Sequence, residues 1–271
     1  MEPQYLGDGL VETQDLMVTE GRRIVDSARG RGVVLRLLGG FAVHEHCAGF
    51  APCRRHHLDL DLVGLHRQVG PVIEVFGELG YEERIQVRVA TGTGQAQFVR
   101  DCVHADRDGV RAHEEDHVDV FFDRFKLDHV IDLRERLALH RYAVSLTDTL
   151  AMKLQMHDPE ARDVRDVLML LATAPREGPA AGDLDPDYLG KLCAHDWGLF
   201  YDVSRNLQRL LEAVSDAGLG RGERQAVTRL LTRLTGAVDA APKTVAWRIR
   251  ARAGTRLRWW DVVEEQEGVA S

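Results

Sequence analysis

The sequence from residue 35 to residue 62 reads LRLLGGFAVHEHCAGFAPCRRHHLDLDL and decides the fold prediction. The apolar run at its start predicts a short buried strand that ends at Gly39 and Gly40. At its other end apolar and acidic residues alternate, which is typical of a strand with one buried face. Alternate side chains of a strand share a face, so Asp59 and Asp61 are expected about 6–7 Å apart on one side. Two carboxylates this close repel each other unless a cation lies between them, which predicts a magnesium site.

Composition limits the class of protein. A chain of 271 residues allows one large domain or two modest ones, and 44% hydrophobic with 29% charged residues is ordinary for a globular protein. The formal net charge of −8 predicts no general attraction to nucleic acid or membrane surfaces. The four cysteines form no disulfide framework for a chain of this length. Without a signal-peptide pattern or a long apolar run, we expect a cytoplasmic protein that has no membrane partner.

The order of helix and strand patterns predicts an α+β fold. A mixed β-sheet with flanking helices is expected in residues 1–144, and a helical domain in residues 145–271. Strands are expected at 33–38, 57–63, 85–91, 95–102, 117–122 and around 130–131, with a polar loop at 104–116. Helices are expected at 12–29, 40–47, 67–80, 147–157, 161–173, 187–217, 222–239 and 243–253, with a linker at 175–186.

Four patches within residues 33–172 resemble, in order, the nucleotidyltransferase superfamily that has the DNA polymerase β-type catalytic core. The patches are Gly39-Gly40, the Asp59-x-Asp61 strand, the strand HVDVFFD that contains Asp119, and a helical segment with Lys153 followed by Arg162-Asp163-Val-Arg-Asp166. The last patch is similar to the AbiEii-type toxin nucleotidyltransferases. The resemblance implies a nucleotidyltransferase-type sheet in residues 1–144 and an active site completed by residues 145–173.

In this family the acids bind metal. The resemblance implies that Asp59, Asp61 and Asp119 hold two Mg²⁺ ions, which stabilise the attacking and leaving oxygens of an in-line transfer. Asp61 and Asp119 would lie at the catalytic ion, and Asp59 at the ion that carries the triphosphate. Asp123 shares the strand face of Asp119 and is a competing candidate. The alternative is that these acids face solvent on an amphipathic sheet.

The glycine pair is expected to bind the nucleotide phosphates. Gly39 and Gly40 lack a Cβ, so the backbone can approach a phosphate, and the helix that follows offers free N–H groups. The pair departs from the Gly-Ser form that is common in the toxin family. Arg55, next to Arg54, is expected to neutralise triphosphate charge, or else belongs to a solvated basic loop.

The helical segment supplies further candidates. Lys153 is expected to direct its ammonium toward the triphosphate. Asp163 and Asp166 are three residues apart on one helix face and would position the acceptor or act as a base. The alternative is that Arg162 and Asp166 form an ordinary surface ion pair.

Two more segments have unusual composition. Residues 44–57 could bind zinc, although their spacing fits no standard zinc motif. Residues 243–258 hold six basic residues and no acid beside several tryptophans, which suits RNA or another polyanion, or else a helical bundle packed by the tryptophans. The candidate zinc ligands are His44, His46, Cys47, Cys53, His56 and His57.

The sequence therefore predicts a Mg²⁺-dependent nucleotidyltransferase. It would move a nucleoside monophosphate from an NTP such as ATP to a tRNA, a protein or a small molecule, and release pyrophosphate. A cognate antitoxin is a possible partner. One alternative is an adenylyltransferase that modifies an aminoglycoside or lincosamide antibiotic, for which an acidic chain is slightly better suited. The other is a non-catalytic nucleotide-binding scaffold.

Overall fold

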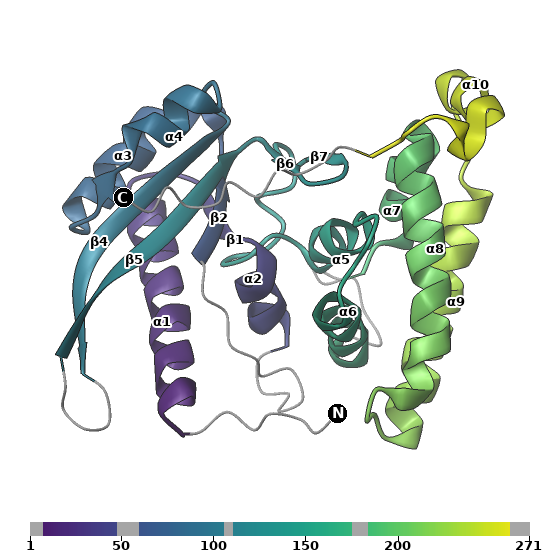
Figure 1. Cartoon of the computed structure of the whole chain (residues 1–271), viewed down its shortest axis with the longest axis horizontal. Helices are drawn as coiled ribbons and strands as arrows, with labels where there is room; N and C mark the ends of the chain where they lie inside the picture. The colour runs from purple at the N-terminus through teal and green to yellow at the C-terminus, as the bar shows by residue number, and fades with distance from the viewer. Residues whose placement is uncertain (1–7, 48–59, 106–110, 175–183, 261–271) are drawn as a thin grey trace. The chain divides into compact units, whose positions relative to one another are not determined.

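The computed structural model describes residues 8–47, 60–105, 111–174 and 184–260 (Figure 1). The chain divides into two compact units. The short segment 126–131 groups with the second unit, although it precedes the last part of the first unit in the sequence. The first unit comprises Met1–Phe125 and Asp132–Ser145, and the second comprises Lys126–Ile131 and Leu146–Ser271.

A five-stranded mixed sheet forms the centre of the first unit (Figure 1). The strand order is β1-β2-β5-β4-β3, in which β2 and β5 run parallel and the other neighbours run antiparallel. The two strands that carry the predicted acids are therefore adjacent inside the sheet. The strands are β1 (Leu35–Leu37), β2 (Leu60–Gly64), β3 (Glu82–Glu83), β4 (Gln95–Ala105) and β5 (Arg111–Phe122). The helices of this unit are α1 (Asp8–Gly30), α2 (Gly39–His46), α3 (Val69–Glu78) and α4 (Ile85–Ala90), with a 3-10 turn at His66–Gln68.

The apolar face of the sheet packs under helices α1 and α3. A cross-strand row of Leu60, Val118 and Phe98 lies on this face, and all three side chains are buried. Phe98 stacks on Phe76 of α3 with ring centroids 3.9 Å apart. Because side chains alternate along a strand, the row next to this one points to the opposite face.

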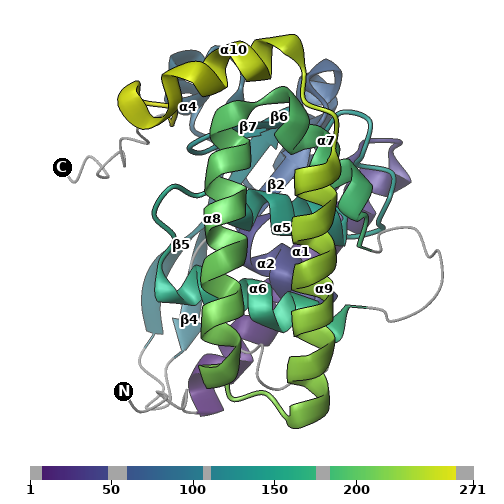
Figure 2. The same ribbon diagram turned by 90° about the vertical axis from the view of Figure 1, so that its right-hand side faces the viewer.

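The second unit is helical (Figure 2). Helices α7 and α9 approach closely at Gly190, where an added Cβ would lie 2.6 Å from the carbonyl oxygen of Ala237. The helices are α5 (Leu146–Leu154), α6 (Ala161–Thr173), α7 (Pro186–His195), α8 (Trp197–Ala213), α9 (Arg221–Ala240) and α10 (Val245–Ala253). A two-stranded hairpin of β6 (Arg124–Lys126) and β7 (Val130–Asp132) carries the chain between the units.

The predicted α+β class is confirmed: a mixed sheet with flanking helices precedes a helical part. Three local predictions are wrong. The expected strand at 85–91 is helix α4, because β3 ends the pairing with β4 after two residues. Most of the expected loop at 104–116 belongs to β4 and β5. The expected helix 187–217 is two helices, because Asp196 accepts hydrogen bonds from the N–H groups of Gly198 and Leu199 and starts a new helix. None of the described helices combines the length and the apolar character that crossing a bilayer requires.

Candidate functional site

Two of the predicted acids are direct neighbours in the sheet. Asp61 of β2 and Asp119 of β5 are register partners across the parallel strand pair. Register partners point to the same face, and neighbouring strands are about 4.8 Å apart, so the two carboxylates share a small area. This face is opposite the buried row of Leu60, Val118 and Phe98. Both acids are only half-buried, so their carboxylates lie within reach of solvent and small ligands.

The structure distinguishes Asp119 from its competitor, Asp123. The strand β5 ends at Phe122, and Asp123 has a positive φ of 64°. Its Oδ1 accepts the N–H of His66 at 2.9 Å, which starts the 3-10 turn after β2. The alternation of side chains along β5 therefore does not extend to Asp123. Asp119 is the acid that lies beside Asp61 on the sheet.

Two glutamines that the sequence analysis did not select hold Asp119. The Nε2 groups of Gln95 and Gln97 both donate to Oδ1 of Asp119, at 3.0 and 3.2 Å. Gln97 is the register partner of Asp119, so Asp61, Asp119 and Gln97 form one cross-strand row. The alternation Gln95-Ala-Gln97-Phe could have indicated these residues, because it places both amides on the polar face of β4.

The predicted phosphate turn lies against the same acids. Gly39 has a φ of +55°, and a methyl group added to it would lie 2.8 Å from Oδ2 of Asp61. The N–H of Leu38 donates to the backbone oxygen of Asp61 at 2.8 Å, which fixes the turn to β2. Gly39 and Gly40 are the first residues of α2, so the positive end of the helix dipole is directed toward this carboxylate. A phosphate is favoured at the same position for the same reason.

Part of the predicted set lies outside the described residues: Asp59, Arg55 and three of the candidate zinc ligands, Cys53, His56 and His57. Within the described residues, no three His, Cys, Asp or Glu side chains are gathered so that they could hold a metal ion. Asp61 and Asp119 provide two neighbouring carboxylates, and carboxylate oxygens are the ligands that Mg²⁺ prefers. The Mg²⁺ site with Asp59 as its third acid stays a prediction.

His46, one of the described zinc candidates, has a structural role. Its Nε2 lies 2.8 Å from the carbonyl oxygen of Val144, so this nitrogen carries the proton and donates. Burial lowers the pKa of His46 to about 4, even though the backbone hydrogen bond acts in the opposite direction. Cys47, at the end of the same helix, is buried and forms no disulfide with the described cysteines.

The candidates of the second unit form a buried ion cluster. The Nζ of Lys153 lies 2.7 Å from Oδ1 of Asp163 and 3.1 Å from Oδ2 of Asp166, and all three side chains are buried. The other oxygen of Asp163 accepts the N–H of Glu160 at 3.2 Å, at the start of α6. The surface pair of Arg162 with Asp166 that we considered as an alternative is wrong, because Arg162 pairs with Glu160 at 2.9 Å. The catalytic roles of these residues stay predictions.

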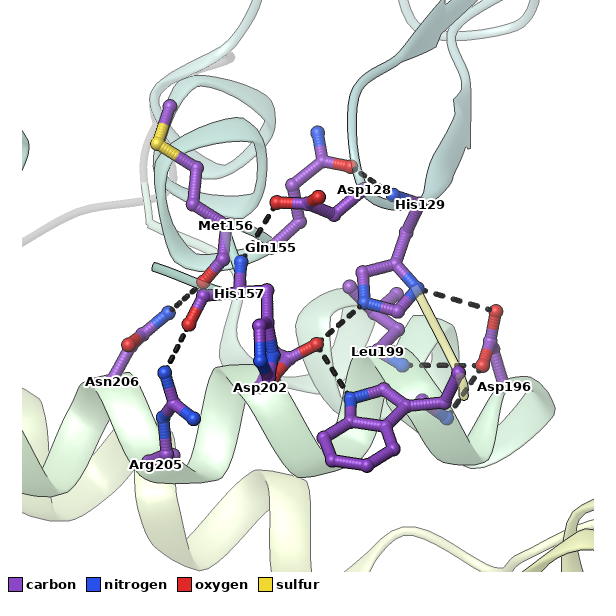
Figure 3. A network of polar contacts seen from close by, with 12 residues as sticks. Asp128, His129, Gln155, Met156, His157, Asp196, Leu199, Asp202, Arg205 and Asn206 are labelled. Atoms are coloured by element: carbon purple, nitrogen blue, oxygen red, sulfur yellow. Dashed lines mark hydrogen bonds and ion pairs between the residues drawn. The ribbon is translucent and has the colours of Figure 1, made fainter. Parts of the chain in front are cut away.

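A second polar network of this unit is centred on Asp202, which is fully buried in α8 (Figure 3). Its carboxylate accepts from His129, His157 and the indole N–H of Trp259, each at 2.9 Å. Burial raises the pKa of Asp202, but these hydrogen bonds outweigh the effect, and the net pKa is lowered. Trp259 also packs edge-on against Trp197, so this half-buried tryptophan packs against the bundle. The sequence alone gave no signal that these distant residues meet.

No family model matches the sequence, and no curated protein matches it. Two solved structures are similar to the fold. One is the antibiotic-resistance factor ANT(2'')-Ia, with a TM-score of 0.35, 11% identity, and coverage of 59% of this chain and 84% of that chain. The other is an antigenic nucleotidyltransferase-like protein from Paracoccidioides brasiliensis, with a TM-score of 0.38, 13% identity, and coverage of 86% of this chain and 96% of that chain.

Proposed function

We propose that this protein is a Mg²⁺-dependent nucleotidyltransferase that moves a nucleoside monophosphate from an NTP to an acceptor and releases pyrophosphate. One observation carries the proposal: Asp61 and Asp119 are paired on one sheet face, and the glycine start of α2 lies against Asp61. Nucleotidyl transfer requires a place for metal-neutralised phosphates more than it requires a nucleophilic side chain. Two carboxylates beside a helix N-terminus meet that requirement.

Each residue has a defined task in this proposal. Asp59, Asp61 and Asp119 would hold the Mg²⁺ ions, which supply charge neutralisation at the attacking and leaving oxygens when bound. Gln95 and Gln97 keep one oxygen of Asp119 oriented. The N–H groups of Gly39 and Gly40 would bind phosphate oxygens.

The AbiEii-type resemblance adds a finer proposal, in which Arg55 and Lys153 neutralise triphosphate charge, and Asp163 and Asp166 serve the acceptor. It is supported by the ion cluster that brings Lys153, Asp163 and Asp166 together. In that case the acceptor is a tRNA or a protein, and a cognate antitoxin would be a partner.

A second acceptor class is favoured by the distribution of charge. The first unit, residues 1–125 and 132–145, holds 17 Lys or Arg and 23 Asp or Glu, a net charge of −6. An acidic unit around the candidate site attracts a cationic small molecule and repels RNA. An aminoglycoside is such a molecule, so an antibiotic adenylyltransferase is the second candidate function.

The test is transfer of label from each α-³²P-labelled NTP in the presence of Mg²⁺. Total tRNA, a cell protein extract and an aminoglycoside mixture are supplied as separate acceptors. We expect label in one acceptor pool, equimolar pyrophosphate, and loss of both with Asp61→Asn or Asp119→Asn. Which pool is labelled decides between the acceptor classes.

Asp123→Asn is the matched control. It is an acid four residues from Asp119, but it caps a turn, and asparagine tolerates its positive φ. We expect it to keep full transfer activity. Transfer that survives Asp61→Asn, or an NTP that binds without turnover in every pool, would instead support the non-catalytic scaffold.

A further inference from the structure

The last four helices differ in charge from the rest of the chain. Residues 184–260 hold thirteen Lys or Arg and eight Asp or Glu, a net charge of +5, although the whole chain has −8. Within this part, residues 243–260 contain no acid at all. Although the whole chain is acidic, α10 and the turn that follows it therefore form a basic region.

One side of α10 combines exposed apolar and basic side chains. Val245 and Ile249 are 71% and 61% exposed, and Leu257 in the following turn is 60% exposed. Positions 245, 248, 249 and 252 are spaced i, i+3, i+4 and i+7, which places them on one helix face. We call the set Val245, Arg248, Ile249 and Arg252 the α10 face.

Two other basic residues of this segment, Lys243 and Arg250, are engaged inside the unit. Lys243 lies over the ring of Phe200, at 4.7 Å from its centroid, and donates to the carbonyl oxygen of Val238. Arg250 donates to the carbonyl oxygens of Gly254 and Leu257. In contrast, the arginines of the α10 face are exposed and form no ion pair with any residue that the structure describes. Within the described residues their charge is therefore not neutralised, and the acids that follow, Asp261, Glu264, Glu265 and Glu267, lie outside those residues.

The kind of partner follows from the apolar members of the face. A nucleic acid is bound by cations together with aromatic rings on which bases stack. The aromatic rings here are used internally, since Trp247 packs edge-on against Phe200 and Trp259 against Trp197. Exposed aliphatic side chains at i and i+4 are instead the pattern by which one helix packs on another. Arginines on the same face require acidic residues opposite.

Helix α4 shows that the basic charge distinguishes the α10 face. Ile85 and Val89 are also spaced i and i+4 and are 55% and 71% exposed. The arginine between them, Arg88, is paired with Glu83 at 2.5 Å. The apolar pair of α4 therefore lacks free positive charge, and it provides a matched control.

We propose that the α10 face is a docking surface for an acidic amphipathic helix of a partner protein. Aliphatic side chains of that helix would pack on Val245 and Ile249, and its carboxylates would pair with Arg248 and Arg252. This inference does not depend on the nucleotidyltransferase proposal, since it concerns surface residues outside the candidate site.

The probe is a fluorescein-labelled synthetic helix of ~18 residues, long enough to form a helix, with leucines on one face and glutamates elsewhere. Binding to the full chain is followed by fluorescence anisotropy at physiological salt. We expect saturable binding, and a loss of about tenfold or more in affinity for Val245→Ser/Ile249→Ser. The matched variant Ile85→Ser/Val89→Ser is expected to bind like the unmodified chain. Thermal unfolding of both variants checks that they fold.

Four outcomes overturn the proposal. A scrambled peptide of the same composition that binds equally well shows attraction by charge alone. A single-stranded RNA or anionic vesicles that bind to the face, when the peptide does not, assign it to a nucleic acid or a membrane. Binding by a chain ending at Trp260, but not by the full chain, assigns the face to residues 261–271. Equal losses in the α10 and α4 variants show a general effect of removing apolar surface.

Discussion

Asp61 and Asp119 are register partners on the parallel strands β2 and β5. Their backbones are fixed by the strand pairing, so the separation of the two carboxylates does not depend on a mobile loop. The third neighbour in the same row, Gln97, donates to Asp119, and Gly39 closes on Asp61 from the start of α2. The candidate site is thus a row of side chains on a rigid sheet. The residues that contact the two acids can be substituted one at a time.

Gly39→Ala is expected to damage the site and the fold together. The new Cβ would lie 2.8 Å from Oδ2 of Asp61, and the φ of +55° is unfavourable for alanine. We expect the free energy of unfolding to fall by about 2–3 kcal/mol, measured by urea denaturation. Under the proposed function, transfer activity of the folded variant falls as well.

The control for this change is Gly92→Ala. Gly92 has a φ of +58°, but an added Cβ meets no atom within 4 Å. This variant therefore suffers the backbone strain without the collision, and we expect a loss of about 1 kcal/mol and unchanged activity. Equal losses of stability at both glycines would show that Asp61 shifts aside at no cost.

The two glutamines are expected to act as positioning residues for a metal ligand. In Gln95→Leu/Gln97→Leu, Oδ1 of Asp119 loses both amide donors. We expect the Mg²⁺ concentration that gives half of the Mg²⁺-dependent rise in Tm to increase about tenfold or more. Gln86, an exposed residue of α4, supplies the control Gln86→Leu, which should leave this concentration unchanged. An identical Mg²⁺ response in the double variant contradicts the positioning role.

Much of the fold could be predicted because local patterns and tertiary packing agree. The alternation of leucine and aspartate at the end of the opening stretch predicted β2, and the glycine pair predicted the start of α2. Helix α4 could not be predicted, since Ile85, Val87 and Val89 alternate like a strand. Only the end of pairing between β3 and β4, which is a tertiary feature, shows that no strand partner is present there.

The acids and the glycine turn of the candidate site were predictable from the sequence, but its two glutamines were not. Neighbouring aspartates indicate a site because their carboxylates repel each other unless a cation lies between them. Gln95 and Gln97, in contrast, are ordinary polar residues of a strand. Their function depends on the register between β4 and β5, which places Gln97 opposite Asp119. This register could not be predicted from the sequence. The same limit applies to Asp202 and His129, which are 73 residues apart in the chain and meet in the bundle.

Lys153 is expected to be essential for stability, whatever its role toward a nucleotide. Lys153→Met leaves the carboxylates of Asp163 and Asp166 buried without the ammonium that both contact. We expect a loss of about 3–5 kcal/mol in the free energy of unfolding, measured with urea. The triple variant Lys153→Met/Asp163→Asn/Asp166→Asn should lose less, because no uncompensated charge remains.

Arg162→Ala is the control for this ion cluster. Its pair with Glu160 is more than half exposed on both sides, so it should contribute at most about 1 kcal/mol. A Lys153→Met chain as stable as this control would mean that the two acids are neutralised by another group. It would also make a role of Lys153 in ligand binding more attractive than a structural one.

His46 makes the stability of the first unit depend on pH. Burial lowers its folded pKa to about 4, whereas an unfolded histidine titrates near about 6.5. Between these values the unfolded chain binds the extra proton, so the free energy of unfolding rises with pH, and this contribution is complete above about pH 6.5. His46→Gln retains a donor for the carbonyl of Val144 but does not titrate. In urea denaturation from pH 4 to pH 7, we expect the stability of the unmodified chain relative to this variant to rise by about 2–3 kcal/mol. Parallel pH curves for the two chains would show that His46 is protonated as readily in the folded state as in the unfolded one.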